Sequence, residues 1–244
     1  MKPIFKIEKD SVHLWQAFVP DLLPQIDNLS LLLNDAEKER AGRFRFDLHR
    51  LRFVITRAIL RYIISLYSQI PSQDIVFKTG SRGKPSLAQN TDDLQFNASH
   101  SHDMAIYALT TTAAIGVDIE KMESHFNDAV AERFFSSKEY ADLAALPESE
   151  KVPAFYRIWA AREAIIKAMG EGLFASLPAF SINVSEDVQT VECVHSNKIH
   201  SYYLENFSVD PAYQSAFATP KIIKQIVSWK WSETGPVMVQ QIVR

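Results

Sequence analysis

Four side chains between residues 115 and 167 have the charge and spacing needed for metal-assisted phosphate chemistry. Asp118 and Glu120 are two positions apart in Ile115–Glu120, a run that alternates like a β-strand. Side chains i and i+2 of a strand emerge on the same face, about 6.5 to 7 Å apart, so both carboxylates point the same way. Glu163 and Lys167 are four positions apart and would lie one above the other on a helix. Mg²⁺ takes oxygen ligands and leaves positions for phosphate, so these groups suit such a site.

The same spacing also has an ordinary structural interpretation. A half-exposed strand often alternates apolar and acidic residues. A glutamate four positions before a lysine often forms a solvated surface pair on a helix. Spacing alone therefore leaves both the metal site and the surface pair open.

A second polar cluster, made of Ser99, His100, Ser101 and His102, leaves several interpretations open. It could donate hydrogen bonds to a phosphate, contribute to a metal site or contain a nucleophilic serine. The nucleophile is the poorest of these because neither serine lies in the GxSxG sequence of a nucleophile elbow. A plain turn, in which Asn and Ser side chains bond to their own backbone, explains the cluster without any function.

Arginines are concentrated between Lys38 and Arg61, although the chain carries a formal net charge of -3. Such a local excess favours binding of a compact anion, because the planar guanidinium matches phosphate oxygens. A solvated helix flank is the better explanation for most of these arginines, and we expect one or two to touch a ligand. The loop Gly80–Pro85 adds Lys84, but it lacks the GxxxxGK[ST] sequence of a P-loop.

The elements that would position these groups follow from hydrophobic periodicity. Val12–Val19 has the composition of a strand, whereas apolar residues recur every three or four positions from Ala36 to Tyr67 and predict a helix. A Ser-x-x-Glu capping box at Ser136 predicts the start of another helix. We expect a longer helix from Pro153 to Met169, ended by Gly170 and Gly172.

Strand-like runs frame the polar cluster and fill the end of the chain. We interpret residues 97–102 as a turn between the strands Leu94–Phe96 and Met104–Leu109, and further strands follow from Ala179 onward. Both halves of the chain therefore look like helices packed on a mostly antiparallel sheet, which is an α+β fold. We place the division between residues 1–112, the N-terminal half, and residues 113–244, the C-terminal half.

Composition limits the classes of protein to which the chain can belong. With 244 residues, 47% of them hydrophobic, the chain can bury a full core as one large domain or two small ones. Its net negative charge argues against general nucleic-acid binding. Cys193 is the only cysteine, so neither an internal disulfide nor a cysteine-based zinc site can form. No apolar run suits a membrane span or a secretory signal, so we expect a cytoplasmic protein.

Four motifs stand in a characteristic order and spacing. They are Gly83-Lys84-Pro85, Phe96-Asn97-Ala98-Ser99-His100-Ser101, Gly116-Val117-Asp118-Ile119-Glu120 and Trp159-Ala160-Ala161-Arg162-Glu163-Ala164-Ile165-Ile166-Lys167. Together they resemble the surfactin-synthetase-activating (Sfp) type of 4′-phosphopantetheinyl transferase, over residues 36–180. Each motif is short, but four in register are specific. The sequence departs from the family pattern at Arg162, where a lysine usually precedes the helix glutamate.

The resemblance implies a monomer of two similar α+β halves, related by a pseudo-twofold axis, with the active site in the cleft between them. It also implies transfer of the 4′-phosphopantetheine arm of coenzyme A to a serine hydroxyl of an apo acyl or peptidyl carrier protein, releasing adenosine 3′,5′-bisphosphate. The implied cofactor is Mg²⁺, with Mn²⁺ as an alternative. Neither nucleic acid nor a membrane is among the expected partners.

The family pattern also implies roles for individual residues. Asp118, Glu120 and Glu163 would hold the metal ion, and Glu163 would be the catalytic base, directly or through a water. Lys167 would be a catalytic residue beside the pyrophosphate. The other expected contacts to coenzyme A are Lys84, Ser99, His100 and Arg162, with Arg40 or Arg43 at the 3′-phosphate.

Two other functions remain open on the sequence. A non-catalytic module could hold coenzyme A or a carrier protein in the same cleft, although the intact set of Asp118, Glu120, Glu163 and Lys167 argues against it. A metal-dependent phosphohydrolase would use water in place of the serine acceptor and would release product without a carrier.

Overall fold

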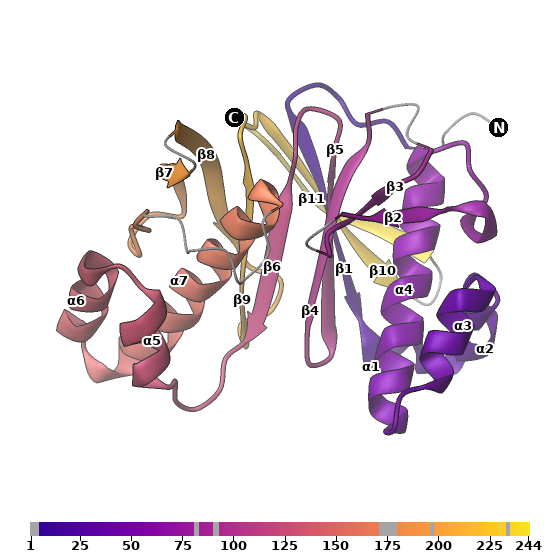
Figure 1. Cartoon of the computed structure of the whole chain (residues 1–244), viewed down its shortest axis with the longest axis horizontal. Coiled ribbons are helices and arrows are strands. Elements are labelled where there is room, and N and C mark those ends of the chain that lie inside the picture. The colour runs from indigo at the N-terminus through magenta and orange to yellow at the C-terminus, as the bar shows by residue number, and fades with distance from the viewer. Residues whose placement is uncertain (1–4, 81–82, 90–92, 171–179, 196–197, 233–234) are drawn as a thin grey trace.

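Two large β-sheets lie side by side in the computed structural model, with helices packed at both ends of its longest axis (Figure 1). A third sheet has two strands, β2 (Phe77–Thr79) and β3 (Pro85–Leu87). The structure describes residues 5–80, 83–89, 93–170, 180–195, 198–232 and 235–244. None of the helices in these ranges is both long and apolar enough to cross a membrane.

The first sheet has five strands in the order β11-β10-β1-β5-β4. Its central strand, β1 (Ser11–Phe18), is parallel to β10 (Gln225–Ser232) and antiparallel to β5 (Met104–Thr110). The two edges of the sheet are β4 (Gln95–Ser101) and β11 (Gly235–Val243). Apolar residues alternate with polar ones along β10 from Val227 to Ser232.

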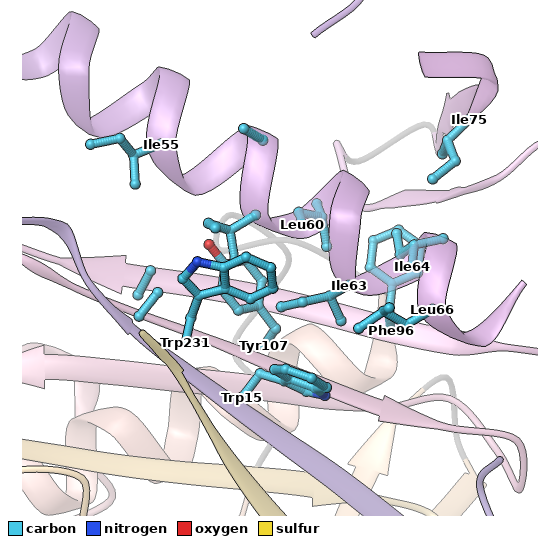
Figure 2. Close-up of a cluster of buried hydrophobic side chains, with 14 of the residues drawn as sticks. Trp15, Ile55, Leu60, Ile63, Ile64, Leu66, Ile75, Phe96, Tyr107 and Trp231 are labelled. Atoms are coloured by element: carbon cyan, nitrogen blue, oxygen red, sulfur yellow. The ribbon is translucent and has the colours of Figure 1, made fainter. Parts of the chain in front are cut away.

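The long helix α4 (Asp47–Tyr67) covers this sheet, and Ile55, Ile59 and Ile63 on its inner face are fully buried. Figure 2 shows this core, where side chains of α4 meet Trp15 and Trp231 from the sheet. The helix expected from residue 36 to 67 is in fact two helices, because the chain is extended at Phe46, just before α4 begins. The smaller elements of this half are α1 (Val19–Leu22), η1 (Leu23–Gln25), α2 (Ile26–Ser30), α3 (Asp35–Gly42), η2 (Ser72–Asp74), β2 (Phe77–Thr79) and β3 (Pro85–Leu87).

The second sheet has four antiparallel strands in the order β6-β9-β8-β7. These are β6 (Gly116–Lys121), β9 (Tyr213–Thr219), β8 (Lys198–Phe207) and β7 (Val188–His195). The long helix α7 (Glu148–Met169) packs on this sheet through small residues such as Ala161 and Ala164, which meet Ala216 and Ala218 of β9. The short side chains let the helix lie close to the strands.

The ends of the helices in this half follow local sequence signals. The capping box expected at Ser136 is confirmed and opens α6 (Ser137–Ala145), which follows α5 (Asp128–Phe134). Gly170 ends α7 in the left-handed conformation, with φ of 77°, as expected, and Gly172 lies outside the described residues. The helix begins at Glu148 and not at Pro153, because acidic residues in its first turn stabilise the amino end.

The expected α+β fold of two similar halves is confirmed, since each half has a sheet covered by one long helix. The expected division at residue 113 does not hold for the end of the chain, because β10 and β11 complete the first sheet. Their aromatic residues explain this placement: Trp231 packs against Tyr62 of α4, with ring centroids 4.7 Å apart, and Trp229 stacks on Trp15 at 5.3 Å.

Candidate active site

The two sheets meet where β4 and β6, one edge of each sheet, lie beside each other (Figure 1). No backbone ladder joins these two strands in the part of the chain that the structure describes, so side chains connect them. Along this junction lie Ser99 of β4, Asp118 and Glu120 of β6, and Glu163 and Lys167 of α7. The structure thus brings residues from both halves to one place.

Ser99, Asp118 and Lys167 form a hydrogen-bonded cluster. Lys167 Nζ donates to Asp118 Oδ1 over 2.6 Å and to Ser99 Oγ over 2.9 Å. Ser99 Oγ donates to the same oxygen of Asp118 over 2.7 Å. Lys167 Nζ also donates to the carbonyl oxygen of Val117 over 3.2 Å, which holds the ammonium against β6. The buried carboxylate of Asp118 is therefore paired with a cation, as a buried charge requires.

Glu163 and Glu120 add two carboxylates whose charge is poorly balanced. Burial and the negative charge of Asp118 raise the pKa of Glu163 to about 7. The same two causes raise the pKa of Glu120 to about 7, although Glu120 accepts hydrogen bonds from Ser101, over 3.0 Å, and from Trp159. Clustered acids that titrate near neutral pH are common at functional sites.

These carboxylates suit a divalent cation. Asp118 Oδ2 is buried without a hydrogen-bond partner among the described residues, whereas buried polar atoms are normally bonded. Mg²⁺ would satisfy that oxygen and relieve the repulsion between Asp118, Glu120 and Glu163. In the conformation described, no three His, Cys, Asp or Glu side chains of the described ranges are close enough together to ligate one ion. Binding would therefore require movement of these side chains.

The approach of β6 to α7 depends on a missing side chain. A Cβ at Gly116 would lie 2.0 Å from the carbonyl oxygen of Ala164 and 2.4 Å from the amide nitrogen of Ala168. Only glycine allows the strand to pass this close to the helix backbone. Asp118, two residues along the same face of β6, consequently reaches Lys167.

Lys84 extends from the first half into the second. Its Nζ donates to the carbonyl oxygens of Ile115, over 2.8 Å, and Lys167, over 2.7 Å. The second bond satisfies a carbonyl in the last turn of α7, where the helix dipole favours a cation. Burial and the charge of Lys167 lower the pKa of Lys84 to about 8. In the loop expected at Gly80–Pro85, residues 81 and 82 lie outside the described residues.

His100 follows Ser99 on β4 and lies in a positive environment. Partial burial and the charges of Lys167 and Arg52 lower the pKa of His100, so its ring is neutral at pH 7 and can donate or accept a hydrogen bond. Arg52 of α4 pairs with Asp103 over 2.7 Å. Lys84, Lys167 and Arg52 therefore bring positive charge to the environment of the acids, and the neutral ring of His100 could add a hydrogen bond to an anionic ligand.

Arg162 pairs with α6 in this structure, and its expected contact with coenzyme A stays a prediction. Its guanidinium is buried and donates to both oxygens of Glu139, over 3.0 Å and 2.8 Å. It also lies over the ring of Phe180, 4.4 Å from the centroid. Glu139 is the third helical residue of α6 and completes the capping box with Ser136, so Arg162 joins α7 to α6.

Arg40 and Arg43 are exposed near the end of α3. Arg43 pairs with Glu39, and the guanidinium of Arg40 lies 4.9 Å from the centroid of the Phe53 ring. None of their described contacts joins either arginine to the cluster around Asp118. Their expected role at a phosphate stays a prediction.

The prediction of a turn at residues 97–102 is wrong, and the difference affects the site. β4 continues to Ser101, and only the residues after it form the turn. Asn97, Ser99 and Ser101 therefore lie on one face of a strand, and all three reach β6. The sequence indicates no role for Asn97 or for the indole of Trp159, and it does not indicate that Ser101 bonds to β6. The alternation of polar side chains at 97, 99 and 101 was the signal that could have found Asn97 and Ser101.

Comparison with known proteins gives matches in both halves of the chain. A family model described as "4'-phosphopantetheinyl transferase superfamily" matches residues 114–218, and one described as "4'-phosphopantetheinyl transferase, N-terminal" matches residues 20–112.

Individual relatives cover most of the chain. The chain is 34% identical over 197 residues to 4'-phosphopantetheinyl transferase psf-1 of Bacillus pumilus, covering 81% of this chain and 83% of that protein. It is 37% identical over 174 residues to 4'-phosphopantetheinyl transferase HetI of Nostoc sp., covering 70% and 73%. It is 34% identical over 185 residues to 4'-phosphopantetheinyl transferase Sfp of Bacillus subtilis, covering 75% and 80%.

Proposed function

Because this chain belongs to the 4′-phosphopantetheinyl transferase superfamily, we propose that it transfers the 4′-phosphopantetheine arm of coenzyme A to a serine hydroxyl of an apo acyl or peptidyl carrier protein. Adenosine 3′,5′-bisphosphate would be the second product. The observation that supports this most strongly is the junction of the two halves, where Asp118, Ser99 and Lys167 are joined by hydrogen bonds beside the buried Glu163 and the half-buried Glu120.

Asp118, Glu120 and Glu163 would hold Mg²⁺, with Mn²⁺ as an alternative. The unpartnered Oδ2 of Asp118 and the raised pKa values of both glutamates support this assignment. A bound divalent cation would supply positive charge that neutralises the pyrophosphate of coenzyme A.

The cationic groups of the site would hold the anionic substrate. Lys167 would turn from Asp118 toward the pyrophosphate, and its charge would stabilise the departing phosphate. Ser99 and His100 would donate hydrogen bonds to the phosphate oxygens. Lys84 could join them only by giving up one of its two backbone oxygens, so we assign it a smaller share of the binding.

Glu163 would be the general base. A serine hydroxyl is a weak nucleophile near neutral pH and needs a base within hydrogen-bond reach. With a pKa of about 7, Glu163 can accept the proton as the serine oxygen bonds to the β-phosphorus. The bond from that phosphorus to the oxygen of the adenosine bisphosphate breaks in the same step, and the electron pair leaves with that oxygen.

Mass spectrometry of a panel of apo carrier proteins tests this proposal. After incubation with the full chain, coenzyme A and Mg²⁺, we expect the mass of the phosphopantetheine arm to appear on a serine of at least one carrier. Binding of coenzyme A with no carrier modified would favour a binding module instead. Release of adenosine 3′,5′-bisphosphate without a carrier would favour a phosphohydrolase. We propose that the chain acts as a monomer in the cytoplasm, which light scattering and cell fractionation would check.

A further inference from the structure

The edge of β6 that faces β4 is hydrogen-bonded by side chains of β4 and not by the backbone of that strand. On its other edge, β6 pairs with β9 in an antiparallel ladder. On the edge toward β4, the amide of Val117 donates to Asn97 Oδ1 over 2.9 Å, and the amide of Lys121 donates to Ser101 Oγ over 3.1 Å. Two polar side chains thus take the place of the backbone acceptors that an additional strand would provide.

The residues bonded in this way flank the acids of the site. Val117 precedes Asp118, and Lys121 follows Glu120. Both bonds join residues 20 positions apart, so β4 and β6 run in the same direction and stay in one register. Between the two bonds, Ser99 of β4 meets Asp118 over 2.7 Å. The register of the strands therefore decides which side chains face each other across the junction.

Ser101 also acts on an acid directly. Its hydroxyl accepts from the amide of Lys121 and donates its proton to Glu120 Oε2 over 3.0 Å. Asn97 differs because the bond described for its oxygen goes to backbone, and the residue is 4% exposed. The two residues thus give separate tests of strand position and of carboxylate orientation.

We propose that Asn97 and Ser101 are positioning residues, which fix β6 against β4 so that Asp118 and Glu120 are held for metal binding opposite Ser99. This inference deepens the proposed transferase function, on which its metal-binding part rests. Groups that orient metal ligands without touching the ion affect metal affinity by about 10- to 100-fold in other proteins.

Hydrogen exchange followed by NMR on the full chain tests the strand contact without any activity. In Asn97→Ala we expect the Val117 amide to exchange at least about tenfold faster, and in Ser101→Ala the Lys121 amide to do so. Amides in the β8–β9 ladder should keep their rates. Asn97→Asp and Ser101→Thr, which retain the acceptor oxygen, should restore protection. Unchanged exchange of Val117 and Lys121 in the alanine variants would overturn the inference.

Binding of Mn²⁺, measured by electron paramagnetic resonance, tests the consequence for the metal. We expect the half-saturating Mn²⁺ concentration to rise about tenfold in Asn97→Ala and Ser101→Ala and to recover in Ser101→Thr. The matched control is Leu33→Ala, which removes a buried side chain of the first core and should lower the Tm without moving the Mn²⁺ midpoint.

The outcomes separate this inference from the proposed function. Faster exchange with an unmoved Mn²⁺ midpoint would show that the two residues only stabilise the fold, and the positioning role would be wrong. In another outcome, the wild-type chain modifies no carrier while the alanine variants still show faster amide exchange and a higher Mn²⁺ midpoint. That result would overturn the proposed transferase function and leave the positioning role standing. If Asn97→Ala does not fold, the half-buried Ser101 gives the decisive pair of variants.

Discussion

Asp118 is the residue on which the other groups of the site converge. One of its carboxylate oxygens accepts from Ser99 and Lys167, while the other is buried without a partner among the described residues. Its charge also raises the pKa of both neighbouring glutamates. A change at this position therefore alters every other group of the cluster.

Replacing Asp118 by Asn should greatly reduce transfer to a carrier while the fold stays intact. The amide removes the charge that would bind a cation and attracts Lys167, so we expect transfer to a carrier to fall by about a hundredfold or more. Circular dichroism should show an intact fold, and mass spectrometry of the carrier measures the loss. Transfer at the wild-type rate would contradict the role given to Asp118.

Glu163→Gln should change how stability depends on pH. The pKa of Glu163 is about 7 in the folded chain and 4.5 in the reference state, so the folded chain binds more protons between these values. Stability of the metal-free protein therefore falls as pH rises through this window, by up to about 3 kcal/mol. The variant lacks this loss, so its advantage over wild type should be small at pH 4.5 and largest above pH 7.

Urea unfolding in the presence of a chelator, at pH 4.5 and at pH 8, measures this advantage. Asp74→Asn, an exposed change in the first half, serves as the control and should show no such trend. An advantage of Glu163→Gln that is equal at both pH values would mean that the carboxyl is not held protonated by its neighbours.

The sequence identified most of these residues but not the direction of every side chain. Asp118, Glu163 and Lys167 were expected at one site from their spacing and the family pattern, and the structure brings them together. Arg162 was expected there as well. Neighbouring residues on a helix point about 100° apart, so a residue beside Glu163 faces elsewhere. Its partner Glu139 lies 23 positions away, which local sequence does not reveal.

At the scale of elements, the site depends on how closely β6 lies against α7 and β4. The helix contact requires Gly116, and the strand contact uses side chains of β4. The expected strand at 115–120 and the end of α7 at Gly170 agree with the structure. The expected turn at 97–102 was wrong, because Asn and Ser are typical of turns and their bonds to another strand depend on tertiary contacts.

Gly116→Ala should separate β6 from α7. The added Cβ would meet backbone atoms of Ala164 and Ala168, which cannot rotate away, so we expect a loss of about 3 kcal/mol or more in the free energy of unfolding. Chemical denaturation measures this loss. Gly42→Ala is the matched control, because apart from the local backbone no described atom lies within 4 Å of its added Cβ. Equal stability of the two variants would contradict the close packing described.

For the whole molecule, the main departure from expectation is the course of the chain between the halves. It leaves the first sheet after β5, builds the second sheet and returns to the first as β10 and β11. Local periodicity predicted many of these strands, but β11 was not recognised. The pairing of β1 with β10 joins Ser11 to Gln225. The hydrophobic pattern does not reveal which strands pair when they are so far apart in the sequence.

A fragment of residues 1–112 should therefore not fold, although it contains most of the first half. Without β10 it leaves one edge of β1 unpaired and exposes Trp15. Joining residues 1–112 to residues 221–244 by a short linker should recover structure, because Thr112 and Lys224 both bond to the backbone of Asp10. Tryptophan near-ultraviolet circular dichroism compares the two. A cooperative unfolding transition in the shorter fragment would contradict this prediction.

The return of the chain to its first sheet also has a consequence during translation. Ser11 and Gln225, which are bonded in the finished sheet, are separated by 214 positions. A ribosome adding about 5 to 20 residues per second needs on the order of 10 to 40 seconds to make that stretch. Throughout this interval the apolar strands β1 and β5 of the nascent chain lack β10 and cannot complete their sheet. Its yield in a cell should accordingly depend on chaperones that shield the growing polypeptide.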